Sequence, residues 1–151
     1  MTTDLDLMVH MNNSRYLREC DFARQQFFLE RRLGRAMKQL NVRVMNAGNN
    51  IRYRKSIEFL DVYKIKTKVG KIKTKILYWD DRAIYLEQQI VRNKDDFICA
   101  VNICKMCVIG CTPQTLLSKD HENVKTPAPS TELAKLLESW QLSSERLRKS
   151  V

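Results

Sequence analysis

The stretch that most constrains the fold runs from Asp4 to Tyr16 and continues directly into an apolar segment. It opens with two aspartates and closes with Asn12, Asn13 and Ser14, whose side chains can accept hydrogen bonds from the N–H groups that a first helical turn leaves unpaired. Apolar residues then recur at helical spacing: Tyr16, Cys20, Ala23 and Phe27, with Leu17, Phe28 and Leu29 widening the face. The sequence therefore predicts a mostly buried helix that starts directly after a carboxylate-bearing loop.

After this helix the spacing of apolar residues changes. Leu33-Gly34 predicts a helix C-cap, followed by a short helical turn at 35–40. Alternation then predicts antiparallel strands at 51–59, 62–69, 84–92 and 97–109, with a turn or bulge in the Asn-rich segment before the first and a turn at Trp79 to Ala83. A helix followed by four antiparallel strands indicates the α+β class.

A short repeat interrupts this pattern. Residues 64–68, Lys-Ile-Lys-Thr-Lys, recur as residues 71–75. A seven-residue insertion in a strand reverses the face of every later side chain, so we expect a bulge at Gly70 to restore the register. The prediction is an exposed protrusion at 70–74, with the sheet resuming at Ile76 and Tyr78 and with deletion of 69–75 leaving stability unchanged or higher.

The C-terminal part of the chain divides in two. Residues 112–130 are polar and contain Pro127 and Pro129, which predicts a linker. Residues 132–148 place leucines and Trp140 at helical spacing, which predicts an amphipathic helix. The expected organisation is a domain at 1–111, a linker at 112–130 and a C-terminal helix at 131–151.

Two motifs carry a resemblance to a known family. Asp-x-x-x-His-Met-Asn-Asn-x-x-Tyr-Leu begins at Asp6 and leads into Asp-Phe-Ala-Arg, and Trp-Asp-Asp-Arg-Ala follows at Trp79. From about Thr3 to Gly110 the chain resembles the hotdog-fold acyl-CoA thioesterases of the 4-hydroxybenzoyl-CoA thioesterase type, and most nearly their branch of thioesterase superfamily member six proteins. The resemblance implies an antiparallel sheet wrapped around a long central helix and a homodimer or higher homo-oligomer, and the first strand of the family is expected to be missing from this chain.

The resemblance also implies acyl-CoA hydrolysis with Asp6 as the catalytic residue, because in these enzymes the aspartate stands four residues before the position of His10. Hydrolysis of a thioester needs such a base or nucleophile, together with donors such as the free N–H groups of a helix N-terminus. His10, Asn12 and Asn13 are expected to shape the loop and cap the helix. The alternative for Asp6 is a structural role in which it only accepts hydrogen bonds from loop or helix amides.

One position departs from the enzymes. Val9 stands where many of them have Gly, and a β-branched residue does not readily adopt the positive φ that Gly permits. The loop is then expected to hold Asp6 at a different angle. The alternative function is therefore a catalytically inactive protein of the same fold that binds acyl-CoA or lipid, or serves as a scaffold.

The net charge of +10 favours an anionic partner. CoA phosphates fit this charge, with Arg52 and Arg54 as candidate contacts; a solvated basic surface is the alternative. The lysines between 64 and 75 have no aromatic residue alternating with them on one face, so nucleic acid is not expected as a partner.

Cysteine usage bears on compartment and on metals. Five cysteines and the absence of an N-terminal apolar segment or an ~18-residue apolar run predict a cytoplasmic chain, or one associated with a membrane or the endoplasmic reticulum if it has lost the apolar segment that the resembling proteins carry. Cys104 and Cys107 would point to opposite faces of a strand, so these cysteines and Cys111 are expected to be buried apolar residues. No metal and no cofactor are expected.

Overall fold

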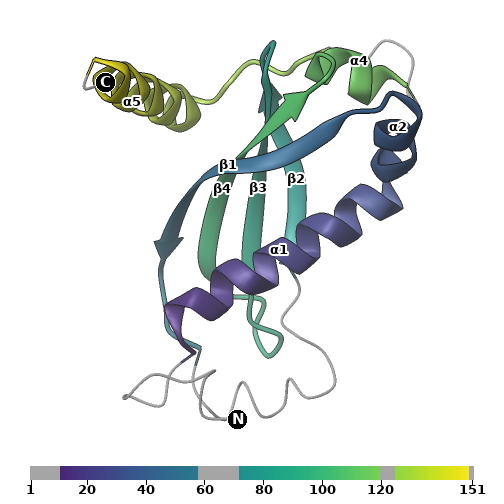
Figure 1. The fold of residues 1–151 in the computed structure, drawn as a ribbon. Coiled ribbons are helices and arrows are strands. Elements are labelled where there is room, and N and C mark those ends of the chain that lie inside the picture. The colour runs from purple at the N-terminus through teal and green to yellow at the C-terminus, as the bar shows by residue number, and fades with distance from the viewer. Residues whose placement is uncertain (1–10, 58–71, 120–124, 150–151) are drawn as a thin grey trace.

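The computed structural model describes residues 11–57, 72–119 and 125–149. One four-stranded antiparallel sheet, in the order β1-β4-β3-β2, curves around the long helix α1 (Asn13–Glu30), which crosses one of its faces (Figure 1). The strands are β1 (Arg43–Tyr53), β2 (Ile72–Trp79), β3 (Ala83–Val91) and β4 (Ile98–Ile109). The predicted α+β class, with a sheet wrapped around a helix, is confirmed.

The start of α1 is the predicted one. Asn12 is the N-cap, and its Oδ1 accepts hydrogen bonds from the N–H of Ser14 at 3.0 Å and from the Ser14 hydroxyl at 2.9 Å. The predicted C-cap at Leu33-Gly34 is wrong. The chain turns two residues earlier at Arg32, which adopts φ +55°, and Gly34 lies inside the next helix, α2 (Leu33–Gln39).

The strand predictions for 84–92 and 97–109 are confirmed by β3 and β4, which pair along their length. β1 begins earlier than predicted, at Arg43, and runs through the Asn-rich segment, because a bulge between Asn46 and Gly48 absorbs one residue without ending the pairing with β4. The bulge was one of the two alternatives expected there. The predicted strand at 62–69 lies outside the described residues.

The second copy of the repeat is not a protrusion. Residues 73–75 belong to β2 and pair with β3, Lys73 with Gln89, Thr74 with Gln88 and Lys75 with Glu87. The register changes between Ile76 and Tyr78 instead of at Gly70, which lies outside the described residues. Both lysines remain exposed because they alternate with Thr74, and Lys75 Nζ lies 3.0 Å from Glu87 Oε1. A regular strand at 73–75 therefore does not bury these lysines.

Deletion of residues 69–75 is still expected to leave stability unchanged, but for a different reason, because residues 73–75 are part of β2. The deletion joins Lys68 to Ile76, so the first copy supplies the same five residues that now precede Ile76. We expect the free energy of unfolding in urea to change by less than about 1 kcal/mol, because the strand that pairs with β3 keeps its sequence and its faces. A loss above about 2 kcal/mol would mean that the first copy cannot replace the second.

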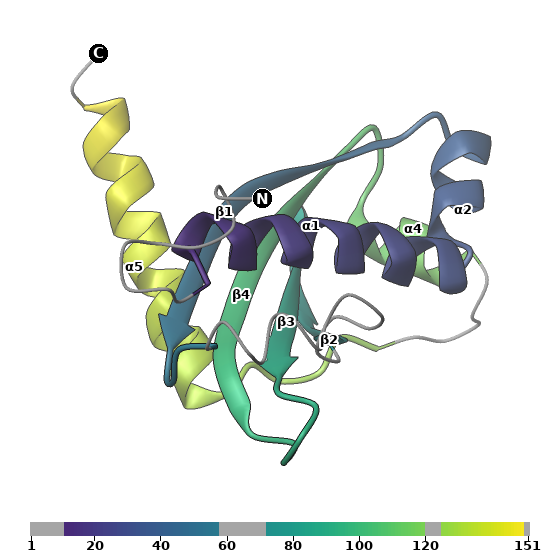
Figure 2. The same cartoon turned by 90° about the horizontal axis from the view of Figure 1, so that it is seen from below.

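The remaining helices lie beyond the last strand. The predicted linker contains α4 (Pro113–Ser118), whose Leu116 and Leu117 are buried in the core, so the prediction of a polar linker is wrong at this point. The C-terminal helix is confirmed as α5 (Thr131–Arg148). It contacts the sheet face opposite α1, where the Trp140 ring stacks on Tyr85 with centroids 6.2 Å apart, and its C-terminal end projects beyond the sheet (Figure 2).

Candidate functional site

A cavity of about 270 Å³ lies at the N-terminus of α1. The end of β1 and the segment after it form one wall, and the first turn of α1 forms the other. Its lining residues are Met11, Asn13, Tyr16, Tyr53, Arg54, Lys55 and Ser56. The sequence analysis predicted the site at the start of this helix, and the assignment of the cavity to that site stays a prediction.

Two tyrosines fix the wall of this cavity. The rings of Tyr16 and Tyr53 pack edge to face with centroids 5.2 Å apart. The Tyr16 hydroxyl accepts a hydrogen bond from the N–H of Ile57 at 3.1 Å, and the Tyr53 hydroxyl donates to the carbonyl of Asn13 at 3.3 Å. Burial raises the pKa of Tyr53, so its hydroxyl stays protonated and remains a donor. A further hydrogen bond, from the N–H of Met11 to the carbonyl of Ile57 at 3.0 Å, links the residue before the N-cap of α1 to the segment after β1.

The first turn of α1 faces the cavity through Asn13. The N–H groups of Ser14 and Arg15 donate to the side chain and the carbonyl of Asn12. The N–H of Asn13 has no hydrogen-bond partner among the described residues. A helix N-terminus carries partial positive charge, so this N–H is a suitable donor for an oxygen that develops negative charge.

Three cationic side chains surround the ring of Phe97, near the end of β1. Arg54, Lys55 and Arg92 lie over the ring of Phe97, with 5.2, 5.9 and 5.8 Å from each charged group to the ring centroid. The N–H groups of Arg54 and Lys55 both donate to the carbonyl of Cys99, which holds the segment after β1 against β4. Phe97 is 36% exposed, so this group of side chains is open to a ligand. The arrangement suits an anion that carries an aromatic ring.

One carboxylate lies beside these cations. Asp95 accepts hydrogen bonds from Arg92 at 2.9 and 2.5 Å, and these bonds hold the pKa of Asp95 at about 2. Arg92 is thus paired with Asp95, whereas Arg54 and Lys55 line the cavity. The pair Arg54 and Lys55 is therefore the better candidate for an anion contact.

The structure separates the two arginines of the sequence prediction. Arg54 lines the cavity, but Arg52 is directed toward α5, where its Nη1 lies 3.9 Å from Glu132 Oε1. Tyr53, between them, points toward α1. Lys55 was not among the predicted contacts, although the run Arg-Tyr-Arg-Lys at 52–55 was a signal for it. Asp6 and His10 lie outside the described residues, as do Asp4 and Val9.

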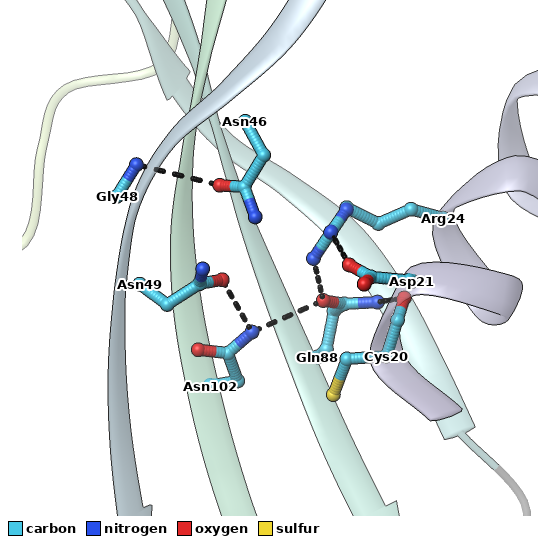
Figure 3. A network of polar contacts seen from close by, with 8 residues as sticks. All are labelled: Cys20, Asp21, Arg24, Asn46, Gly48, Asn49, Gln88 and Asn102. Atoms are coloured by element: carbon cyan, nitrogen blue, oxygen red, sulfur yellow. Dashed lines mark hydrogen bonds and ion pairs between the residues drawn. The ribbon is translucent and has the colours of Figure 1, made fainter. Parts of the chain in front are cut away.

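A row of polar side chains under the middle of α1 was missed by the sequence analysis (Figure 3). We call it the polar layer; its members are Arg24 on α1, Thr74 on β2, Gln88 on β3, Asn102 on β4 and Asn49 on β1. Arg24 is 5% exposed, and Gln88 and Asn102 are fully buried. The signal was present: Gln88 and Asn102 interrupt otherwise apolar alternation on the two central strands.

The polar layer is tightly bonded. Gln88 Oε1 accepts from Arg24 Nη1 and from Asn102 Nδ2, both at 3.2 Å, and Gln88 Nε2 donates to the Cys20 carbonyl at 2.7 Å. Asn102 Nδ2 also donates to Asn49 Oδ1 at 3.2 Å, and Arg24 pairs with Asp21. Two buried oxygens, Asn102 Oδ1 and Thr74 Oγ1, have no partner among the described residues.

The thiols nearest this layer are poor nucleophiles. Burial raises the pKa of Cys20 to about 11 and also raises that of Cys104, although Arg24 acts in the opposite direction on both. Cys104 is buried as predicted, whereas Cys107 and Cys111 are only partly buried. Within the described ranges no group of three His, Cys, Asp or Glu side chains is placed to hold a metal ion. No helix in those ranges is long and apolar enough to cross a membrane.

Comparisons with known proteins agree with this arrangement. Residues 1–137 match the profile of the Thioesterase-like superfamily. Protein THEM6 of Xenopus laevis is 40% identical over 146 residues, which cover 96% of this chain and 67% of that protein.

Solved structures share the fold. The YbaW probable thioesterase of Escherichia coli aligns with a TM-score of 0.61 and 21% identity, over 89% of each chain. The SAV2348 protein of Staphylococcus aureus, solved in complex with CoA, aligns with a TM-score of 0.59 and 13% identity over 84% of each chain. The predicted hotdog fold is confirmed.

Proposed function

The chain belongs to the thioesterase-like superfamily, and from this premise we propose that it binds CoA thioesters and hydrolyses them. The observation that carries the proposal is the cavity of about 270 Å³ at the N-terminus of α1, lined by Asn13 on one side and by Arg54 and Lys55 on the other. It combines a donor for the thioester oxygen with cations for phosphates. The SAV2348 protein, which has the same fold and was solved in complex with CoA, supports the proposed binding of CoA.

In the proposed reaction the thioester carbonyl points its oxygen at the N–H of Asn13. Charge that develops on this oxygen is stabilised by the N–H and by the helix N-terminus. Asp6, which precedes α1 in the sequence, either takes a proton from a water that attacks the carbonyl carbon or attacks this carbon itself. The carbon–sulfur bond then breaks and CoA leaves as a thiolate that takes up a proton. Where Asp6 itself attacked, water then hydrolyses the anhydride between the acyl group and Asp6, which frees the carboxylic acid and restores the aspartate. Asn12 keeps the first turn of α1 in place by capping it.

The phosphates of CoA are assigned to Arg54 and Lys55. Both cations line the cavity, and Phe97 beside them offers a partly exposed ring for an aromatic base. Arg52, the other arginine considered from sequence, is left out of this assignment because it lies 3.9 Å from Glu132 on the far face of the sheet. A homodimer remains part of the proposal, to be tested by light scattering.

The test compares Arg54→Ala/Lys55→Ala with Arg52→Ala in an assay of thiol release from a panel of acyl-CoA esters. The double variant is expected to raise KM about tenfold, because it removes two charge-assisted contacts that are open to solvent, with kcat changed less than about twofold. Arg52→Ala removes one positive charge from the opposite face and is expected to leave both constants unchanged. An equal rise in KM from Arg52→Ala would show that net charge, and not this site, attracts the substrate.

Val9 favours a second candidate, a protein that binds acyl-CoA without hydrolysing it. If Val9 holds the loop at a different angle, a shift of Asp6 by about 1 Å costs roughly 100-fold in rate and leaves the cavity in place. CoA binding measured by calorimetry without thiol release would identify this function. Neither binding nor release would contradict both candidates.

A further inference from the structure

The polar layer divides the core into two unequal apolar parts. Helix α1 and the two central strands each change from apolar to polar and back at the same level. On β3 the order is Leu86, Gln88, Ile90, and on β4 it is Cys104, Asn102, Ala100. On α1, Cys20 lies on one side of Arg24 and Phe27 lies on the other. The layer is therefore continuous from helix to sheet.

The smaller apolar part is the one beside the candidate site. It consists of Tyr16, Cys20, Ile57, Ile90, Cys99 and Ala100, with Met11 and Ile51 packed against it. Tyr16 and Met11 also line the cavity, so an apolar group that enters the cavity meets this cluster next. The larger part, with Phe27, Leu86 and Leu116, lies beyond the polar layer.

An apolar chain cannot cross the polar layer without breaking its bonds. Gln88 uses both ends of its amide, toward Arg24, Asn102 and the Cys20 carbonyl. A methylene chain offers no replacement for these bonds, and Arg24, which is 5% exposed, would keep only its pairing with Asp21. The layer thus acts as a wall at the level of Arg24.

From these observations we propose that the polar layer ends the path of the acyl group, so that the protein selects CoA thioesters whose acyl chains have no more than about ten carbons. The inference rests on the proposed binding of CoA thioesters. The length follows from α1: the eight residues from Tyr16 to Arg24 rise about 12 Å, roughly the length of an extended ten-carbon chain. Arg24, Gln88 and Asn102 are then specificity-determining residues.

The experiment measures binding to the unmodified chain by calorimetry, with CoA and with its S-alkyl thioethers, which cannot be hydrolysed, from about two to about sixteen carbons. Affinity is expected to rise about fourfold with each methylene up to about ten carbons and then to stop rising or to fall. An unbroken rise through the longest chain would overturn the proposal. CoA that fails to bind at all would contradict the proposed function and this inference with it, whereas CoA binding without any dependence on chain length would contradict the inference alone.

Two variants test the residues. Arg24→Met/Gln88→Met replaces the centre of the layer with apolar side chains of similar length, and Asn102→Leu is the milder change should the first variant fail to fold. The folded variant is expected to continue the gain of about fourfold per methylene past the limit of the wild type. Arg18→Met/Gln89→Met makes the same chemical change away from the layer, since Arg18 is exposed and Gln89 points to the other face of β3. A limit of about ten carbons in a folded layer variant would contradict the assignment.

Discussion

Replacing Asp6 with Asn is expected to lower kcat for acyl-CoA hydrolysis at least about 100-fold. The amide has the size of the carboxylate but carries no negative charge and cannot take a proton from water or attack a carbonyl. KM is expected to change little, because Arg54 and Lys55, which line the cavity and are assigned to the phosphates, are untouched. The measurement is thiol release under saturating substrate, together with CoA binding by calorimetry.

Asp4→Asn is the matched control for this prediction. It makes the same change two residues away in the sequence, and its activity is expected to stay within about twofold of the wild type. Asp6→Ala is expected to behave like Asp6→Asn in rate. Full turnover in both Asp6 variants would remove Asp6 from the mechanism and leave Asp4 as the carboxylate to examine.

The predictions that held depend on local chemistry. Asn12 caps α1 because its side chain reaches an N–H two residues away, a contact that the order of residues alone specifies. β3 and β4 follow from alternation because both are central strands with one face on the core. Arg54 was a candidate from its charge; it lines the cavity, and its contact with CoA stays a prediction.

The predictions that failed depend on contacts between distant parts of the chain. The bulge in β2 lies between Ile76 and Tyr78 because pairing with β3 fixes it there, whereas the sequence offered only Gly70 as a flexible point. Arg32 takes the left-handed turn between the first two helices although Gly34 is near. Arg24 pairs with Asp21 on its own helix, but its partner on the sheet, Gln88, is 64 residues away, so the helix sequence alone does not predict the bond that holds Arg24 against the sheet.

Trp79→Ala is expected to lower the free energy of unfolding by about 3–5 kcal/mol. Trp79 is 6% exposed at the end of β2, in the same cluster as Leu116 and Leu117 of α4. Its Nε1–H donates to Gln114 Oε1 at 2.9 Å, and its carbonyl accepts from the Thr126 hydroxyl at 3.0 Å. The ring thus joins the end of β2 to α4, and its removal leaves a cavity and breaks the bond to Gln114, whereas the bond to Thr126 is made by the main chain of Trp79 and remains.

Trp140→Ala is the matched control, since Trp79 and Trp140 are the two tryptophans of the chain. Trp140 is only partly buried and stacks on Tyr85 from the outer face of the sheet, so its removal is expected to cost about 1 kcal/mol. Urea unfolding followed by circular dichroism gives the loss in free energy of unfolding for each variant, provided that the m-value is the same as in the wild type. Trp79→Phe keeps most of the packing and loses the bond to Gln114, and is expected to lie between the two. Equal losses for Trp79→Ala and Trp140→Ala would mean that α5 contributes as much to stability as the joint between β2 and α4. In that case the C-terminal helix would have to be counted as part of the domain instead of as an appendage to it.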